Sequence, residues 1–320
     1  MTNAEIIALL QEDLKGELMA IVQYLRHAYA MGEGELAAEI EAIAREEMRH
    51  FDWVAETIVE LGGKPSMERG AFTGITDDVV QNMRADVQAE VDAINLYRQH
   101  IEAIPDPKIQ RLLSRILSDE ESHHGDFVHF VDKAGAMAEA APAEAPAAEA
   151  KPAGPPARLA AILHEGIQHE YTVILQYLYH RFMMPDCEIG NELEMQAINE
   201  MQHLGWLSEE MEGIGGTPEI EHTGLELPDD PEEMLEADIK VERMVTAAYS
   251  RQIPEIEDPG LKDLVTRIRD HEIYHIELFG DLLEEVEAQE KESAPPEEKP
   301  AAPSAPQPPT VGSLFGQKQD

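Results

Sequence analysis

Glu47-Met-Arg-His-Phe-Asp-Trp53 and Glu200-Met-Gln-His-Leu-Gly-Trp206 are two copies of one motif, and they decide the fold of this 320-residue chain. A second matching pair precedes them: Glu17-Leu-Met-Ala-Ile-Val-Gln-Tyr-Leu-Arg-His27 and Glu170-Tyr-Thr-Val-Ile-Leu-Gln-Tyr-Leu-Tyr-His180. Equivalent residues lie 153 positions apart here and 152 positions apart farther along the chain. A self-similarity of this length indicates a duplicated structural unit.

Each copy is predicted to form four helices, because apolar residues recur at spacings of three and four. In the first copy the expected helices cover residues 4–31, 35–61, 77–103 and 107–136. The connections between the first two and the last two helices are short, whereas the loop at 62–76 is long enough to cross a bundle. The sequence therefore predicts an all-α protein made of two tandem four-helix bundles, each running up-down-down-up with one long crossover.

The apolar stripes are interrupted near their middle by acids and histidines. A carboxylate in a bundle core costs several kcal/mol unless a cation or a hydrogen-bond partner meets it. A single Glu-x-x-His pair is more often part of a solvated helix face, but all eight expected helices carry an acid at the same level. The residues concerned are Glu17, Glu47, His50, Glu90, Glu120, His123, Glu170, Glu200, His203, Glu242, Glu272 and His275.

Charge balance favours metal ions at these positions. In the first copy no Lys or Arg occupies the stripe positions, so four carboxylates are left to be neutralised. Two divalent cations supply that charge if the imidazoles are neutral. Oxygen-rich ligation with one histidine per ion favours iron, or less strongly manganese, over structural zinc. The sequence predicts two buried dinuclear sites.

The composition excludes several other classes of protein. The formal net charge is -41, from 65 acids and 24 bases, which argues against nucleic acid or an anionic membrane as a partner. Cys187 is the one cysteine, so neither a disulfide framework nor a cysteine-based zinc or rubredoxin-type iron site is expected. The chain shows no signal-like beginning and no apolar run of membrane-spanning length, so we expect a cytoplasmic protein.

Two segments rich in Ala, Pro and Glu mark the expected domain boundaries. They cannot bury a core, so residues 137–156 are predicted to be a disordered linker and residues 291–320 a disordered tail. The bundles are then expected at 1–136 and 157–290.

The ligand pattern resembles that of ferritin-like di-iron proteins, in which two helices give one Glu and two give Glu-x-x-His. More narrowly, residues 17–27, Glu47-Met-Arg-His50 and Asp119-Glu-Glu-Ser-His123 resemble bacterioferritin. The resemblance implies that each half holds two irons through terminal Glu–His pairs and two bridging glutamates. The implied terminal pairs are Glu17–His50, Glu90–His123, Glu170–His203 and Glu242–His275, and the implied bridges are Glu47, Glu120, Glu200 and Glu272.

The resemblance also implies an activity, the oxidation of Fe(II) to Fe(III) by O2 or H2O2 for iron storage. Tyr24 and Tyr177 lie two turns after the first Glu, where an electron-donor role and a purely structural hydrogen bond are both open. A rubrerythrin-like peroxidase is disfavoured because Ala93 and Val245 stand where that family has an extra glutamate. A manganese catalase-type enzyme and a non-catalytic iron-binding scaffold are the remaining alternatives.

Met48 and Met201 occupy the position that supplies the haem ligand in bacterioferritin. If the two halves pair about a pseudo-twofold axis, they would share one haem b; the alternative is a soft packing residue at an interface. Self-association through the bundles is expected on the same grounds. The resemblance ends after the fourth helix, because a Pro/Ala-rich tail replaces the fifth helix that completes a bacterioferritin shell.

The end of the tail resembles the peptide that loads cargo into encapsulin compartments. Such a peptide, carried on a flexible tether, would place its apolar side chains in pockets of the encapsulin shell protein. We therefore expect the chain to lie inside an encapsulin compartment. The residues of the peptide are Thr310, Val311, Gly312, Ser313, Leu314 and Phe315.

Overall fold

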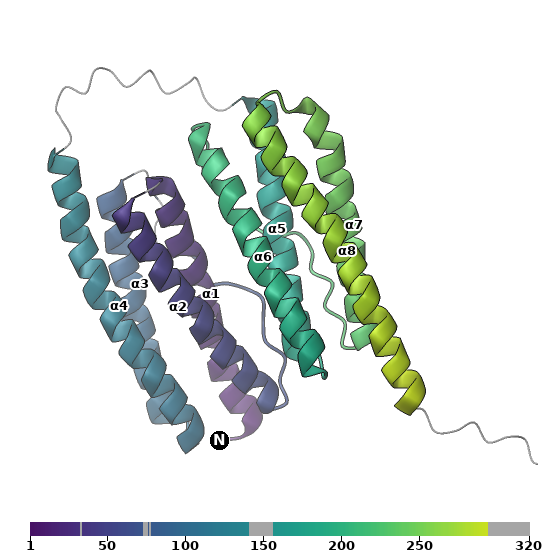
Figure 1. The fold of residues 1–320 in the computed structure, drawn as a ribbon. Helices are drawn as coiled ribbons and strands as arrows, with labels where there is room; N and C mark the ends of the chain where they lie inside the picture. The colour runs from purple at the N-terminus through teal and green to yellow at the C-terminus, as the bar shows by residue number, and fades with distance from the viewer. Residues whose placement is uncertain (33, 73–75, 77, 141–155, 294–320) are drawn as a thin grey trace, which may run out of the picture.

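The structure, a computed structural model, describes residues 1–32, 34–72, 76, 78–140 and 156–293 (Figure 1). Within these residues the chain forms eight α-helices, one short 3-10 helix and no strand. None of the described helices has the length and apolar character needed to cross a bilayer. The helices are α1 (Asn3–Met31), α2 (Glu35–Glu60), α3 (Val79–Ala103), α4 (Pro107–Ala140), α5 (Ala157–Met183), α6 (Cys187–Gly213), α7 (Pro231–Gln252) and α8 (Pro259–Ser293), with η1 (Ile253–Glu255) before α8.

Local signals set the helix ends. Thr2 and Glu5 form a capping box at the start of α1, and Asp106 accepts a hydrogen bond of 2.7 Å from the backbone N–H of Lys108. Gly62, with a φ of 85°, follows the end of α2 in the left-handed region that glycine adopts without strain. α4 continues to Ala140 rather than ending at 136, because its last residues, Met-Ala-Glu-Ala, are helix formers.

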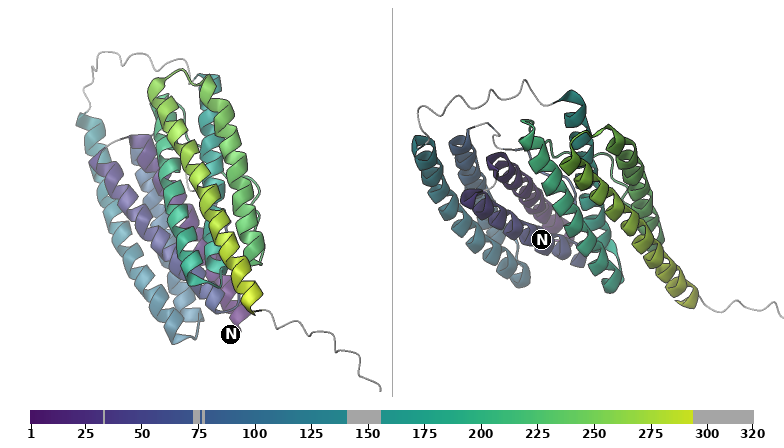
Figure 2. Two further views of the ribbon diagram at one scale, coloured as in Figure 1. Left: turned by 45° about the vertical axis from the view of Figure 1, so that its right-hand side comes forward. Right: turned by 45° about the horizontal axis from the view of Figure 1, so that its top comes forward.

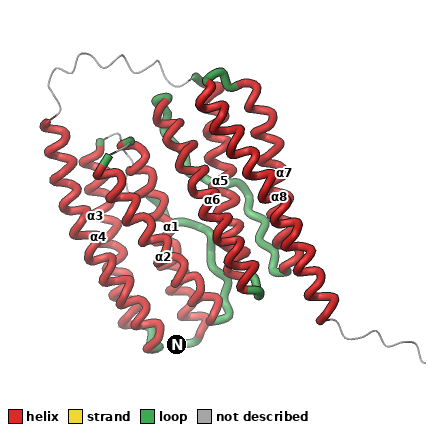
Figure 3. Tube along the Cα trace, viewed as in Figure 1, coloured by secondary structure: helices red, strands yellow, loops and turns green. Residues whose placement is uncertain are grey.

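The helices form two antiparallel bundles, α1–α4 and α5–α8, with the expected up-down-down-up order (Figures 1 and 3). In each bundle a long loop runs along the first helix to connect its second and third helices. Gly70 of the first loop donates its N–H to the carbonyl of Lys15 at 3.0 Å. Glu226 of the second loop donates its N–H to Gln176 Oε1 at 3.0 Å. These bonds fix the crossovers along α1 and α5.

The two bundles pack on each other in a reciprocal way, with α1 against α6 and α2 against α5 (Figures 1 and 2). Buried residues of both bundles belong to one continuous core cluster. Phe51 and Phe182 meet across the junction with ring centroids 6.1 Å apart. Gly205 permits close approach of α6 to α1, since a Cβ there would lie 3.1 Å from the hydroxyl of Tyr29. The repeat is therefore a pseudo-symmetric pair within one chain.

Ion pairs also cross this junction. Arg181 at the end of α5 lies 3.3 Å from Asp52 and 3.0 Å from Glu56, both on α2. Its guanidinium also meets Glu194 of α6 at 3.1 Å, and its side chain is only 14% exposed. A mostly buried guanidinium among three acids costs several kcal/mol to remove, so Arg181 fixes one edge of the junction.

Candidate metal centre

All twelve acids and histidines singled out in the sequence are buried, six in each bundle. In the first bundle α1 and α3 each contribute one Glu, and α2 and α4 each contribute a Glu and the His three residues later. Because residues three apart share a helix face, each Glu-x-x-His pair points to the same interior as the solitary acids. The structure brings these side chains together in four groups of candidate ligands, each composed of three Glu and one His.

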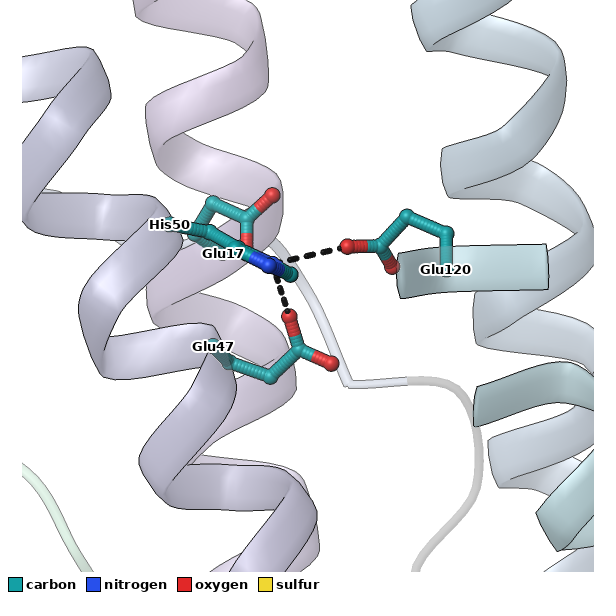
Figure 4. Close-up of side chains that lie close together, drawn as sticks. All are labelled: Glu17, Glu47, His50 and Glu120. Atoms are coloured by element: carbon teal, nitrogen blue, oxygen red, sulfur yellow. Dashed lines mark hydrogen bonds and ion pairs between the residues drawn. The ribbon is translucent and has the colours of Figure 1, made fainter. Parts of the chain in front are cut away.

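His50 lies at the centre of the first group (Figure 4). Its Nδ1 atom is 2.9 Å from Glu47 Oε2 and 2.9 Å from Glu120 Oε1. Glu17 Oε2 lies 3.7 Å from the same nitrogen. Three carboxylates from three helices thus surround one imidazole nitrogen.

Glu47 connects this group to the next one. Its second oxygen, Oε1, lies 2.8 Å from Nδ1 of His123. Both groups contain Glu47 and Glu120, whereas Glu17 and His50 belong to one and Glu90 and His123 to the other. Two shared acids with one private Glu–His pair on each side is the arrangement of a dinuclear site with bridging carboxylates.

The second bundle repeats this geometry. Nδ1 of His203 is 2.7 Å from Glu200 Oε2 and 3.3 Å from Glu272 Oε1. Nδ1 of His275 is 2.6 Å from Glu200 Oε1 and 3.2 Å from Glu272 Oε2. The private acids, Glu170 and Glu242, lie 3.5 and 3.6 Å from the two imidazoles, respectively.

The electrostatics of the first site show an excess of negative charge. Burial raises the pKa of Glu17 well above its usual range, and the nearby charge of Glu120 adds to the effect. Burial acts on Glu47 too, but hydrogen bonds from His123 and His50 outweigh it and lower the pKa to about 2. Burial disfavours the charged form of His123, yet its hydrogen bond to Glu47 raises its pKa to about 9. Protons therefore balance the charge of the carboxylates, and divalent cations would take their place.

Several carboxylate oxygens of the two sites are buried and have no hydrogen-bond partner within the described part of the chain. Across the described residues, the cationic groups within 4.0 Å of the site carboxylates are all imidazoles. Carboxylate and imidazole donors of this kind suit iron and manganese. The partnerless atoms include Oε2 of Glu17, Glu90, Glu170 and Glu242, and both carboxylate oxygens of Glu272.

Four tyrosines lie directly behind the private acids. Tyr24 donates its hydroxyl to Glu90 Oε1 at 2.6 Å, and Tyr177 donates to Glu242 in the second bundle. Both tyrosines thus lie beside the candidate ligands, as expected from the sequence. Tyr97 and Tyr249, which the sequence reasoning did not assign to the site, donate to Glu17 and Glu170. The signal was present, since Tyr97 lies on the apolar stripe of its helix seven residues after Glu90.

A buried His–Asp pair also accompanies each site and was not predicted. His27 Nδ1 lies 2.8 Å from Asp86, and the amide of Gln23 donates to the same carboxylate at 2.8 Å. His180 and Asp238 repeat the pair at 2.9 Å. Both histidines end the repeated segment at the start of each half, and Asp86 lies four residues before Glu90, so the pattern could have been found.

The remaining predicted site residues lie elsewhere. Met48 on α2 and Met201 on α6 are half-buried and pack against the core cluster that the two bundles share, outside the carboxylate groups. Because α1 adjoins α6 and α2 adjoins α5, the two methionines come from opposite halves of the junction. The peptide Thr310–Phe315 lies outside the described residues.

Comparison with known proteins agrees with the duplicated architecture. The family model described as "Ferritin-like domain" matches twice, over residues 7–137 and 160–288. A bacterioferritin of Desulfovibrio desulfuricans is 34% identical over 127 residues, which is 38% of this chain and 71% of the relative. A bacterioferritin of Streptomyces coelicolor is 34% identical over 132 residues, covering 39% of this chain and 78% of the relative.

Proposed function

Because the chain belongs to the ferritin-like family and carries its domain twice, we propose that it is a di-iron ferroxidase that oxidises Fe(II) to Fe(III) for iron storage and detoxification. One observation carries the proposal. In each bundle four buried carboxylates and two imidazoles converge at one level of the core, with carboxylate oxygens that no described residue satisfies. Buried acids in this number need protons or cations to balance their charge, and two divalent ions per bundle would replace the protons.

The proposed roles follow from which residues the groups share. In the first bundle Glu17 with His50 would hold one iron and Glu90 with His123 the other, and Glu47, with Glu120, would bridge them. The equivalent residues of the second bundle are the terminal pairs Glu170–His203 and Glu242–His275 and the bridges Glu200 and Glu272.

The reaction balances with two irons per site. Each Fe(II) gives up one electron, and the pair of electrons with two protons converts O2 to H2O2, or H2O2 to two waters. Carboxylate oxygens favour the more highly charged ferric product. Tyr24 and Tyr177 donate hydrogen bonds to terminal acids, so they would orient those acids, and we propose them as donors of a further electron to the oxidant.

Anaerobic titration of the full chain with Fe(II), followed by mixing with O2 or H2O2, tests the proposal. We expect about four ferrous ions to bind per chain, two for each dinuclear site, with rapid ferric absorbance on adding oxidant. Bound Fe(II) that is not oxidised rapidly by either oxidant would refute the ferroxidase function. Tighter binding of Mn(II) than of Fe(II) at equal concentration would identify manganese as the metal of these sites.

Haem b is a second proposed group, held between the bundles by the thioethers of Met48 and Met201. The fit rests on the reciprocal junction. Each half contributes one methionine there, and both methionines pack against the apolar core cluster that the bundles share. A bound haem would supply a path for electrons to ferric iron. Titration with haem should give an absorbance spectrum of bis-thioether ligation that the Met48→Leu variant lacks, and an identical spectrum in that variant would remove the assignment.

The proposed location is an encapsulin compartment, reached through the peptide Thr310–Phe315. Its support is the sequence pattern alone, with apolar Val311, Leu314 and Phe315 at the end of a Pro-rich segment. Coexpression with an encapsulin shell protein should yield co-purification that is lost when residues 310–320 are deleted. Unchanged co-purification of the truncated chain would refute the cargo role of the peptide. Self-association through the bundles is proposed as well.

A further inference from the structure

The two dinuclear sites differ just outside their ligands. In the first bundle the outward nitrogen of each imidazole faces a carboxylate. His50 Nε2 lies 3.4 Å from Asp119 Oδ2, and His123 Nε2 lies 2.9 Å from Glu46 Oε2. A carboxylate behind a ligating imidazole fixes the ring and makes it a stronger donor to the metal.

Neither carboxylate is present in the second bundle. Asn199 occupies the position of Glu46, and His271 that of Asp119. His271 Nδ1 lies 3.1 Å from His203 Nε2, so a neutral ring takes the place of the acid. His275 Nε2 is buried and has no hydrogen-bond partner among the described residues. Among the described residues of the second site, therefore, no carboxylate faces the outward nitrogen of either imidazole.

The outer side of the second site adjoins a pocket. A pocket of about 430 Å³ is lined by residues that include His203, His271 and Asn199. Arg267 and Asp270 line the same pocket, and the guanidinium of Arg267 lies 4.4 Å from the ring of Trp206, as that of Arg115 lies 4.9 Å from the ring of Trp53 in the first bundle. The arginine is therefore common to both sites, and the difference between them lies in the groups that face the outward imidazole nitrogens.

We infer that the first site binds its metal pair tightly and retains it, whereas the second site binds more weakly and releases its ions. This inference rests on the proposed function of the same residues. Removing an outer partner of a metal-bound histidine lowers metal affinity by about 10- to 100-fold. The difference is expected to grow for ferric iron, because a higher ionic charge benefits more from the acids behind His50 and His123.

Equilibrium binding of Co(II), measured by calorimetry on the full chain without any oxidant, tests the inference. Glu200→Ala silences the second site and Glu47→Ala the first, so that each affinity is measured alone. We expect the first site to bind Co(II) at least about tenfold more tightly than the second. Equal affinities would overturn the inference.

The decisive experiment exchanges the outer residues between the two sites. With the second site silenced, the Glu46→Asn and Asp119→His pair should weaken the first site by about tenfold or more. With the first site silenced, Asn199→Glu and His271→Asp should strengthen the second. Unchanged Co(II) affinities after both exchanges would show that the outer residues do not cause the difference between the sites.

A matched control separates local hydrogen bonding from overall charge. Glu121→Gln removes one acid from α4 that pairs with Arg98 at 2.5 Å and lies outside both candidate ligand groups. Asp119→Asn, which removes one outer acid, should weaken Co(II) binding, whereas Glu121→Gln should leave the affinity unchanged. Equal effects of the two variants would refute the local explanation. The Co(II) measurements involve no oxidation of iron, so the two proposals can fail separately. Unequal Co(II) affinities with no oxidation of bound Fe(II) would refute only the ferroxidase proposal. Rapid oxidation of Fe(II) with equal Co(II) affinities would refute only this inference.

Discussion

Removing one bridging acid should eliminate one dinuclear site and leave the other intact. Glu47 is fully buried, and its two oxygens lie 2.9 and 2.8 Å from His50 and His123. It is a member of both ligand groups of its bundle, so Glu47→Ala takes one ligand from each ion. The charge available to two divalent ions falls from −4 to −3, and the coordination of both becomes incomplete.

The expected size of the effect follows from this sharing. Tight Fe(II) binding should fall from about four to about two ions per chain, and the amplitude of rapid oxidation should fall by about half. Glu200→Ala should act in the same way on the second bundle, and the double variant should show no rapid phase. Stopped-flow absorbance after anaerobic titration measures both quantities.

The bundle itself should survive the change. His50 still contacts Glu120 at 2.9 Å and His123 still contacts Glu46 at 2.9 Å, so neither imidazole is stranded. Far-ultraviolet circular dichroism should confirm unchanged helix content, and Glu102→Ala on the exposed side of α3 is the matched control. If Glu47→Ala keeps four tightly bound ions and the full rapid amplitude, the assignment of Glu47 as a bridge is wrong.

The remaining predictions concern protons, the junction and the tyrosines. Burial raises the pKa of Glu242 from 4.5 to about 8, and carboxylate hydrogen bonds outweigh burial to raise that of His203 from 6.5 to about 12. Both groups bind protons more tightly when folded, so the melting temperature of the ion-free protein should fall from about pH 5 to pH 8, with a rise contradicting this account. Arg181→Ala should lower the free energy of unfolding by about 3 kcal/mol in urea titrations, whereas a loss under about 0.5 kcal/mol would mean that the junction does not depend on it. Tyr24→Phe and Tyr177→Phe should weaken Fe(II) binding by about tenfold and abolish any tyrosyl-radical resonance after mixing with peroxide; a persistent signal would exclude the electron-donor role.

The positions of the candidate ligands were predictable because burial follows the helical repeat. A Glu-x-x-His pair and a solitary Glu, placed on otherwise apolar stripes, can face only the bundle interior. Capping signals such as Asp106 before Pro107 fixed the helix starts within a residue or two. Local chemistry was therefore enough for the fold of each bundle and for its ring of acids.

The docking of the two bundles could not be predicted in the same way. Phe51 and Phe182 lie far apart in sequence, and nothing in their own helices says that their rings meet. The residues around Arg181 in α5 do not indicate its acidic partners, because those partners lie on other helices, α2 and α6. Such contacts depend on how whole helix surfaces fit together, and no local sequence pattern encodes that fit.

The outer layer of the sites lies between these extremes. Tyr97 and Asp86 occupy stripe positions, but a tyrosine or an acid there has many structural explanations until its partner is known. Asp119 and His271 are equivalent positions with different residues, so the repeat alone marks them as divergent rather than functional. Distances to His50 and His203 were needed to give the divergence a chemical meaning.

The reciprocal junction within a single polypeptide has an evolutionary consequence. In an assembly of identical subunits every substitution occurs in all copies at once, so a change that favours release of iron also abolishes retention. Here α1–α4 and α5–α8 are different stretches of one chain, so each can change in sequence independently. The chain nevertheless keeps them together at any protein concentration. Selection can therefore specialise one half for capture and the other for delivery, a division of labour denied to a homodimer.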